Sequence, residues 1–415
     1  MGSLNSMMTA TCLPSFARAE TRPWLIALVF AAAVLGISPR LPAQDADTLY
    51  RRGLYAAAKS DPTTAILEFT RVIQLDPTYT KAYEFRANAY RMQRKLDLAF
   101  ADYSQAIQLD PKNAELYNDR GTAYISTHDY TRALADFDQA LQLKPQFVIA
   151  YSNRGLVHQL QRDYNDALAD ENQAIQLDPK SFGAYDLRGI TYTTRGDYDK
   201  AIADFDQALQ LYPGFAQAYC NRGLAYQRKH DYDKALADEN QALRIAPKFV
   251  QAYVFRGTIQ KAIGHDDLAL ADFTTALQLN PKAVIALNRR GEIYAKQGHD
   301  DLALSDFTQA LQLEPSDPTA YNNYAWLLAT SAQAASRDGR KALELATKAC
   351  DLSKWKSPEA LDTLAAACAE TGDFANAVKW EKQCLQDPHF PAAQIAAAQK
   401  RLALYQAHQP YHEAK

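Results

Sequence analysis

The chain has 415 residues, of which 47% are hydrophobic and 22% are charged, a balance that excludes a globally disordered protein. Its formal net charge is −3, and it lacks the long runs of Lys and Arg that mark nucleic-acid binding. The length alone suggests two or three globular domains, but this expectation fails for chains built from repeats. Internal periodicity therefore decides the domain organisation.

The N-terminal segment differs from the rest of the chain. Residues 24–37 read WLIALVFAAAVLGI, carry no charge and follow Arg18 and Arg22. This run is shorter than the roughly 20 apolar residues of a membrane-spanning helix and fits the apolar core of a secretory signal. Cleavage after Ala43 would remove residues 1–43 as a signal peptide, whereas an uncleaved segment would anchor the chain to a membrane through residues 24–37. Either alternative predicts an exported protein, periplasmic or secreted in the first case.

A proline recurs at a fixed interval through most of the chain. Each step is 34 residues, which is the period of a helix–turn–helix repeat. The prolines are Pro77, Pro111, Pro145, Pro179, Pro213, Pro247, Pro281 and Pro315. A proline at this place ends the second helix at little cost, because no helical amide is needed there.

Small residues recur in the same register. With the proline as position 32, the first repeat begins at Ala46. Position 8 is Gly53, Ala87, Gly121, Gly155, Gly189, Gly223, Gly257 and Gly291. Position 20 is Ala65, Ala99, Ala133, Ala167, Ala201, Ala235, Ala269 and Ala303. Small side chains at these positions allow the first and second helices of a repeat, A and B, to approach closely.

These residues resemble the tetratricopeptide-repeat family over about residues 46–407. The resemblance implies an all-α protein, a right-handed superhelical solenoid of antiparallel helix pairs. We expect eight complete repeats at 46–317, two divergent repeats at 318–390, a capping helix at 391–407 and a frayed tail at 408–415. The divergent segment is similar to the terminal module of many bacterial members, so an exported bacterial protein is expected.

Charged residues occupy two further positions in phase. Position 7 is Arg86, Arg120, Arg154, Arg188, Arg222, Arg256 and Arg290, and position 23 is Asp102, Asp136, Asp170, Asp204, Asp238, Asp272 and Asp306. We interpret them as structural ion pairs rather than a track for an anionic ligand, because every arginine has an aspartate in register. The pattern leaves open whether each aspartate belongs to the same repeat or to the preceding one.

Position 24, usually aromatic, is Glu171 and Glu239 in repeats four and six. A carboxylate in a core position needs a partner, so we expect a contact between His158 and Glu171 and a hydrogen bond between Tyr226 and Glu239. A catalytic role for His158 and Glu171 is disfavoured because no nucleophile or third group accompanies them.

The chain shows no other sign of chemistry. It contains no GxxxxGK[ST], HExxH or GxSxG motif, and its histidines lie in different repeats, so we expect no enzyme, no metal and no cofactor. Cys368 and Cys384 fall on facing helices, where they form either a disulfide, with Cys350 as a competitor, or small apolar packing.

The family resemblance implies that helix A lines a concave surface through positions 2, 5, 9 and 12. Candidate peptide-binding residues are Asn88, Asn118, Thr122, Leu156, Gln159, Ile190, Leu224, Gln227, Thr258, Asn288, Asn322 and Trp326. Leu156, Ile190 and Leu224 either form an apolar centre of this polar groove or pack between neighbouring A helices. The family's carboxylate clamp requires Lys at position 5, which is absent, so binding of an acidic C-terminal peptide is not expected.

The sequence thus predicts a non-enzymatic scaffold that binds an unidentified protein or peptide. The alternative is a structural or assembly component that acts through self-association or through its convex face. We expect no nucleic-acid partner, and membrane contact only through the N-terminal segment if it is retained.

Overall fold

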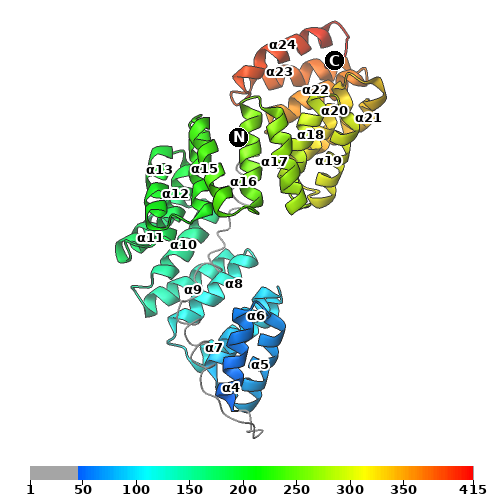
Figure 1. Cartoon of the computed structure of the whole chain (residues 1–415). Helices are drawn as coiled ribbons and strands as arrows, with labels where there is room; N and C mark the ends of the chain where they lie inside the picture. The colour runs from blue at the N-terminus through cyan, green and yellow to red at the C-terminus, as the bar shows by residue number, and fades with distance from the viewer. Residues whose placement is uncertain (1–44, 415) are drawn as a thin grey trace. The chain divides into compact units, whose positions relative to one another are not determined.

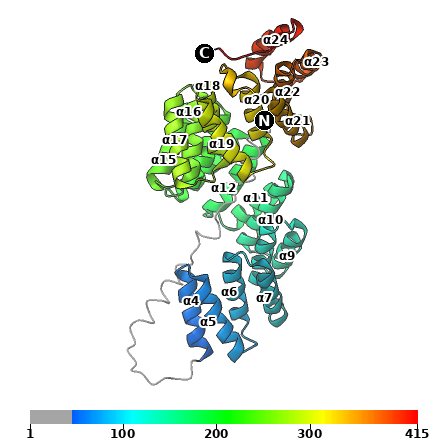
Figure 2. The same ribbon diagram turned by 90° about the vertical axis from the view of Figure 1, so that its right-hand side faces the viewer.

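The computed structural model describes residues 45–414, in which all regular structure is helical (Figure 1 and Figure 2). The segment at 24–37 and the cleavage site at Ala43 lie outside the described residues. Within the described part, no helix combines the length and the apolar character that crossing a membrane requires.

The described chain divides into two units, residues 45–221 and 222–414. The first unit contains α4 (Ala46–Ala58), α5 (Pro62–Leu75), α6 (Thr80–Met92), α7 (Leu96–Leu109), α8 (Ala114–Ser126), α9 (Tyr130–Leu143), α10 (Val148–Gln161), α11 (Tyr164–Leu177), α12 (Phe182–Arg195) and α13 (Tyr198–Leu211). The boundary falls within α14 (Ala216–Arg228).

The second unit continues the same alternation and then diverges. It contains α15 (Tyr232–Ile245), α16 (Val250–Ala262), α17 (Asp266–Leu279), α18 (Val284–Lys296), α19 (Asp300–Leu313), α20 (Pro318–Thr330), a short 3₁₀ turn (Ala334–Ser336), α21 (Gly339–Leu352), α22 (Pro358–Glu370), α23 (Phe374–Gln386) and α24 (Ala392–Gln406). The A helices are the even-numbered helices from α4 to α22, and the B helices are the odd-numbered helices from α5 to α23. The last helix, α24, belongs to neither set. The helix predicted at 391–407 is α24, which packs on α23.

Left-handed residues make the turn from helix A to helix B. The φ angle is 59° at His128, 61° at His230 and 86° at Gly196. A single left-handed residue reverses the chain sharply, and glycine takes this conformation without strain. His128 and His230 therefore lie in the turns of separate repeats. In the described residues, no three His, Cys, Asp or Glu side chains gather as metal ligands.

A glycine and an aromatic ring fix the distance between helices A and B. An added methyl group at Gly121 would lie 2.8 Å from Cε1 of Phe137, so only glycine fits beneath the ring. In the fourth repeat Glu171 replaces the ring. A methyl group at Gly155 would there find its nearest neighbour atom 3.4 Å away, an ordinary contact. The small residues predicted at position 8 thus mark the places where helices A and B approach most closely.

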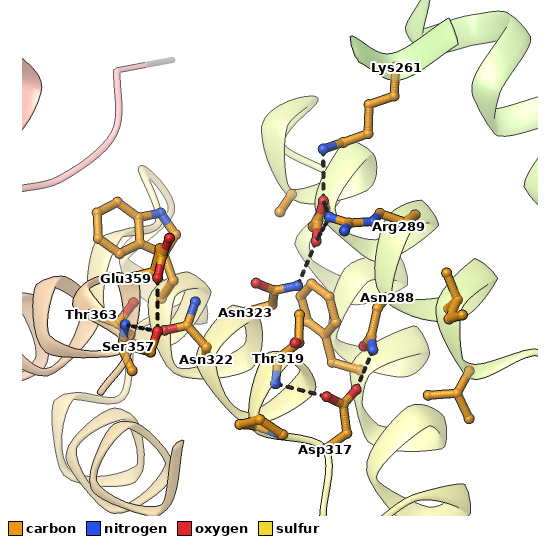
Figure 3. A pocket seen from close by; sticks show the side chains of 18 of the residues that line it. Lys261, Asn288, Arg289, Asp317, Thr319, Asn322, Asn323, Ser357, Glu359 and Thr363 are labelled. Atoms are coloured by element: carbon orange, nitrogen blue, oxygen red, sulfur yellow. Dashed lines mark hydrogen bonds and ion pairs between the residues drawn. The ribbon is translucent and has the colours of Figure 1, made fainter. Parts of the chain in front are cut away.

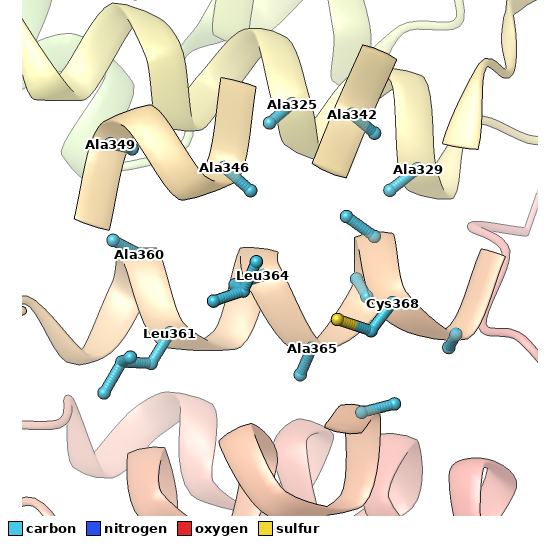
Figure 4. Packing of buried hydrophobic residues seen from close by; sticks show 14 of the residues in the cluster. Ala325, Ala329, Ala342, Ala346, Ala349, Ala360, Leu361, Leu364, Ala365 and Cys368 are labelled. Carbon is cyan, nitrogen blue, oxygen red and sulfur yellow. The ribbon is translucent and has the colours of Figure 1, made fainter. Parts of the chain in front are cut away.

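Alanine dominates the core of the divergent repeats. Figure 4 shows side chains of α20, α21 and α22 that meet in one buried cluster, among them Ala325, Ala346, Leu364 and Cys368. Small side chains let these three helices approach one another closely. This packing replaces the glycine–ring contact of the regular repeats.

The cysteines of the divergent repeats are not bridged. Cys350, Cys368 and Cys384 are buried free thiols, so the disulfide considered for Cys368 and Cys384 does not form. Burial raises the pKa of the Cys350 thiol to about 12 and that of the Cys368 thiol to about 11. These three thiols act as small apolar side chains.

Candidate functional site: a groove along the A helices of the second unit

The second unit contains an open groove of about 2030 Å³. Its walls come from the A helices α16, α18, α20 and α22, from α24, and from residues 411–414 (Figure 3). Successive A helices therefore build it, as the concave surface predicted from sequence requires. Asn288, Asn322 and Trp326 are the predicted site residues that it brings together.

An ionic cluster occupies the groove near α16 and α18. Lys261 Nζ lies 2.7 Å from Glu292 Oε2, and Arg289 Nη1 donates to Glu292 Oε1 at 2.9 Å. Burial alone would raise the pKa of Glu292, but the two cations outweigh it and hold the pKa below its usual value. Asn323 donates to the same carboxylate at 2.8 Å. Two positive charges thus share one negative charge here.

Polar side chains of α20 form the middle of the groove. Asp317 caps this helix by accepting from the Thr319 amide at 2.9 Å, and it also accepts from Asn288 Nδ2 at 2.7 Å. The half-buried side chains of Thr319 and Asn322, by contrast, make no hydrogen bond to other residues of the described chain, and Asn322 Oδ1 is buried without a partner. The Asn322 side chain is therefore not committed to a bond within the described chain, although its oxygen is covered.

The predicted polar residues of the first unit are used within the fold. Asn88 Nδ2 donates to Asp119 at 3.3 Å, and Asn118 Oδ1 accepts from Asn153 at 2.9 Å. Asn153 also donates to Thr122 at 3.4 Å, and Gln159 donates to Thr191 at 3.1 Å. These bonds join neighbouring A helices, so they stabilise the stacking of repeats.

The predicted apolar centre of the groove is mostly covered. Ile190 and Leu224 are only 6% and 4% exposed, while Leu156 is half-buried. Ile190 and Leu224 therefore pack between helices, the second of the two alternatives that the sequence left open. Gln227 and Thr258 are half-buried, and the Thr258 hydroxyl donates to the Val254 carbonyl of its own helix.

The arginine–aspartate ladder pairs residues of the same repeat. Arg256, for example, donates to Asp272 from Nε at 2.8 Å and from Nη2 at 2.7 Å, and its Nη1 donates to Asn240 on the preceding B helix at 2.6 Å. The other ladder pairs are Arg86–Asp102, Arg120–Asp136, Arg154–Asp170, Arg188–Asp204, Arg222–Asp238 and Arg290–Asp306. Each of these guanidinium groups is thus paired with a carboxylate inside the fold, as expected for structural ion pairs.

The expected contact between His158 and Glu171 is replaced by another. Glu171 accepts from the Thr191 hydroxyl at 2.7 Å, a residue of the next A helix, and His158 Nε2 lies 3.9 Å from Asp170 instead. Thr191 belongs to the next repeat, whereas the predicted partner lies in the same repeat as Glu171. Burial raises the pKa of Glu171 to about 8. The hydrogen bond expected between Tyr226 and Glu239 stays a prediction.

Two further buried carboxylate sites were not predicted. Asp186 accepts from Asn221 Nδ2 at 2.9 Å, and burial raises its pKa to about 7. Arg401 of α24 donates to Asp362 from Nε at 3.0 Å and from Nη2 at 2.7 Å, and its Nε lies 3.3 Å from Glu381. Asp186 stands at position 5, one of the positions expected to line the concave surface, and this was the only sequence signal for the first site. No sequence signal indicated the second site.

Residues 408–414 are held against the second unit rather than frayed. The Glu413 amide donates to the Thr330 carbonyl at 2.7 Å, and the Trp326 indole N–H donates to Glu413 Oε1 at 2.8 Å. His412 lies 2.7 Å from Glu370. The tail thereby forms one end of the groove.

Family models match most of the regular repeats. Models described as TPR repeat and tetratricopeptide repeat match residues 87–127, 121–162, 189–230, 216–249, 250–282 and 284–317. No curated protein matches the chain in sequence.

Solved structures are similar in fold. A tetratricopeptide repeat protein from Parabacteroides merdae has 22% identity and a TM-score of 0.51, over 60% of this chain and 98% of that chain. Yeast Tom70 has 18% identity and a TM-score of 0.48, over 92% of this chain and 91% of that chain. YrrB, described as a TPR protein with an unusual peptide-binding site, has 27% identity and a TM-score of 0.35, over 44% of this chain and 95% of that chain.

Proposed function

Because the chain belongs to the tetratricopeptide-repeat family, we propose that it is a non-enzymatic scaffold that binds an extended segment of a partner protein in the groove of the second unit. The size of the groove carries this proposal. Its volume of about 2030 Å³ exceeds the roughly 300–1,000 Å³ of sites for small molecules and suits a stretch of polypeptide.

The chemistry of the groove supports the same function. The Asn322 amide has no partner in the described chain, and a rotation that uncovers its oxygen lets it both donate to and accept from a peptide backbone. The Thr319 hydroxyl lies on the same helix. Val250, Val284 and Trp326 add apolar surface for side chains of the bound segment. A mixture of apolar surface and a few free polar groups is typical of a site that orients its ligand.

A peptide-display selection on the full-length protein tests this function. Selected peptides are measured by fluorescence anisotropy against wild type, Asn322→Leu and the matched control Gln312→Leu, which lies exposed on α19. Loss of one hydrogen bond should weaken binding by about two- to tenfold in Asn322→Leu and leave the control unchanged. Failure to select any peptide, or equal affinity of both variants, would contradict the proposed use of this groove.

An exported location is a separate proposal that rests on residues 24–37 alone. Fractionation of cells that make the tagged full-length chain tests it, with a variant carrying Leu28→Arg as the control. We expect the wild type outside the cytoplasm and the variant inside. Wild type recovered only from the cytoplasm would contradict the proposal.

A further inference from the structure

The C-terminal tail lies in the groove in the manner of a bound peptide. Residues 411–414 follow the end of α24 and adopt no helix, and Tyr411, Glu413 and Ala414 contribute to the groove wall. Their contacts use the three elements of peptide recognition: one backbone hydrogen bond to Thr330, one carboxylate bond to Trp326 and one aromatic contact. An extended segment thus already occupies one end of this groove.

The aromatic contact brings three groups together. The Arg401 guanidinium lies 5.2 Å from the Trp326 ring centre and 5.7 Å from that of Tyr411, and the two rings lie 6.2 Å apart. Asp362 and Glu381 hold Arg401 from behind, so its position does not depend on the tail. The cation and the Trp326 ring form a prepared place for an aromatic side chain.

Trp326 differs from its equivalents in other repeats. At position 9, Asn88, Thr122 and Glu292 all bond to position 6 of the following A helix. The Trp326 indole N–H instead donates to Glu413, a residue of the tail. The polar group at this position joins A helices in three other repeats, and here it bonds to the tail.

We propose that this end of the groove is a binding subsite for a partner segment in which an aromatic residue is followed, two residues later, by a carboxylate. The chain's own Tyr411 and Glu413 occupy the subsite until such a partner displaces them. The inference rests on the proposed function, since the partner continues along the groove. Displacement can leave α24 folded, because residues 408 and 409 lie between that helix and the displaced residues and are exposed.

The test uses the full-length protein and a fluorescein-labelled synthetic peptide HQPYHEA, which has the sequence of residues 408–414. A tail-release variant carries Tyr411→Ala and Glu413→Ala, and a matched tail control carries Gln409→Ala. If the tail occupies the subsite in nine molecules of ten, release should increase affinity for the peptide about tenfold. Wild type and the Gln409→Ala control should bind alike and weakly.

One further protein variant and two altered peptides show whether the peptide binds at the subsite. Adding Trp326→Phe to the tail-release variant removes the indole N–H and keeps an aromatic ring, so peptide affinity should fall by about tenfold. Peptides with Tyr→Ala or Glu→Gln should bind the tail-release variant as weakly as they bind wild type. Circular dichroism checks that each variant is folded.

Three outcomes would overturn the inference. These are no peptide binding by the tail-release variant, equal binding by that variant and wild type, or a tail-dependent dimer in sedimentation, which would show exchange of tails between copies. None of these touches the proposed function, which display-selected peptides and Asn322→Leu test at another part of the groove. Selected peptides that need Asn322 but ignore Trp326 would keep the function and remove the subsite.

Discussion

Glu171 places a titratable group where the regular repeats have a phenylalanine ring. Its side chain is fully buried, and its hydrogen bond comes from the Thr191 hydroxyl. The substitution Glu171→Gln keeps the shape of the side chain and the acceptor for Thr191 but removes the charge. It therefore isolates the cost of ionising this one group.

The magnitude follows from the pKa. Burial raises the pKa of Glu171 from 4.5 to about 8, the Thr191 hydrogen bond and Arg188 oppose the rise, and Asp204 and Asp170 add to it. The folded state therefore holds this proton more tightly than the unfolded chain, and the stability of the neutral form is lost as pH rises toward 8. At about 1.4 kcal/mol per pH unit, the loss between pH 5 and pH 8 is about 4 kcal/mol.

Urea unfolding of both proteins at several pH values measures this loss. The free energy of unfolding of Glu171→Gln minus that of wild type should be near zero at pH 5 and should grow to about 4 kcal/mol at pH 8. Because the other buried carboxyls titrate alike in both proteins, their contribution cancels in the difference between the two free energies of unfolding. Parallel curves over this range would show that Glu171 ionises freely in the folded state and would refute the reasoning.

Three further predictions test the packing. Gly121→Ala should destabilise by about 1–3 kcal/mol because its methyl group meets the ring of Phe137, whereas Gly155→Ala should be neutral or stabilise by about 1 kcal/mol; equal urea midpoints would contradict this. Arg256→Lys should cost about 1–3 kcal/mol in thermal unfolding, since Lys cannot form the paired bonds to the carboxylate, and should exceed the effect of Arg244→Lys on the surface. The three buried thiols of α21, α22 and α23 should resist alkylation at pH 8 until denaturant is added, as peptide mapping would show; rapid labelling of the folded protein would argue against their burial.

The helix pairs could be predicted from sequence because local residue choices determine them. The proline after helix B and the small residues at positions 8 and 20 repeat every 34 residues, and each acts within one repeat. The ladder was also visible, since Arg256 and Asp272 stand in fixed register. Only the structure shows that each arginine pairs with the aspartate of its own repeat, because sequence spacing does not give the distance between helices.

Other parts of the site could not be predicted, because they depend on contacts between repeats. Thr191 comes from the next repeat, and no periodic pattern marks it as the partner of Glu171. Arg401 meets Asp362 across 39 residues, and the tail returns to Trp326 across 87. Burial of Ile190 likewise follows from stacking geometry, which one helix face does not reveal.

The ladder has a consequence for the number of repeats. Each arginine finds its aspartate within its own 34-residue unit, and several make a third bond to a short polar side chain of the unit before, such as Thr70, Asn172 or Asn240. Recombination that deletes or duplicates one whole unit therefore leaves every arginine with the aspartate of its own unit. The ladder therefore sets no limit on repeat number, whereas contacts that join two particular repeats, such as Thr191 with Glu171, restrict which units can be lost.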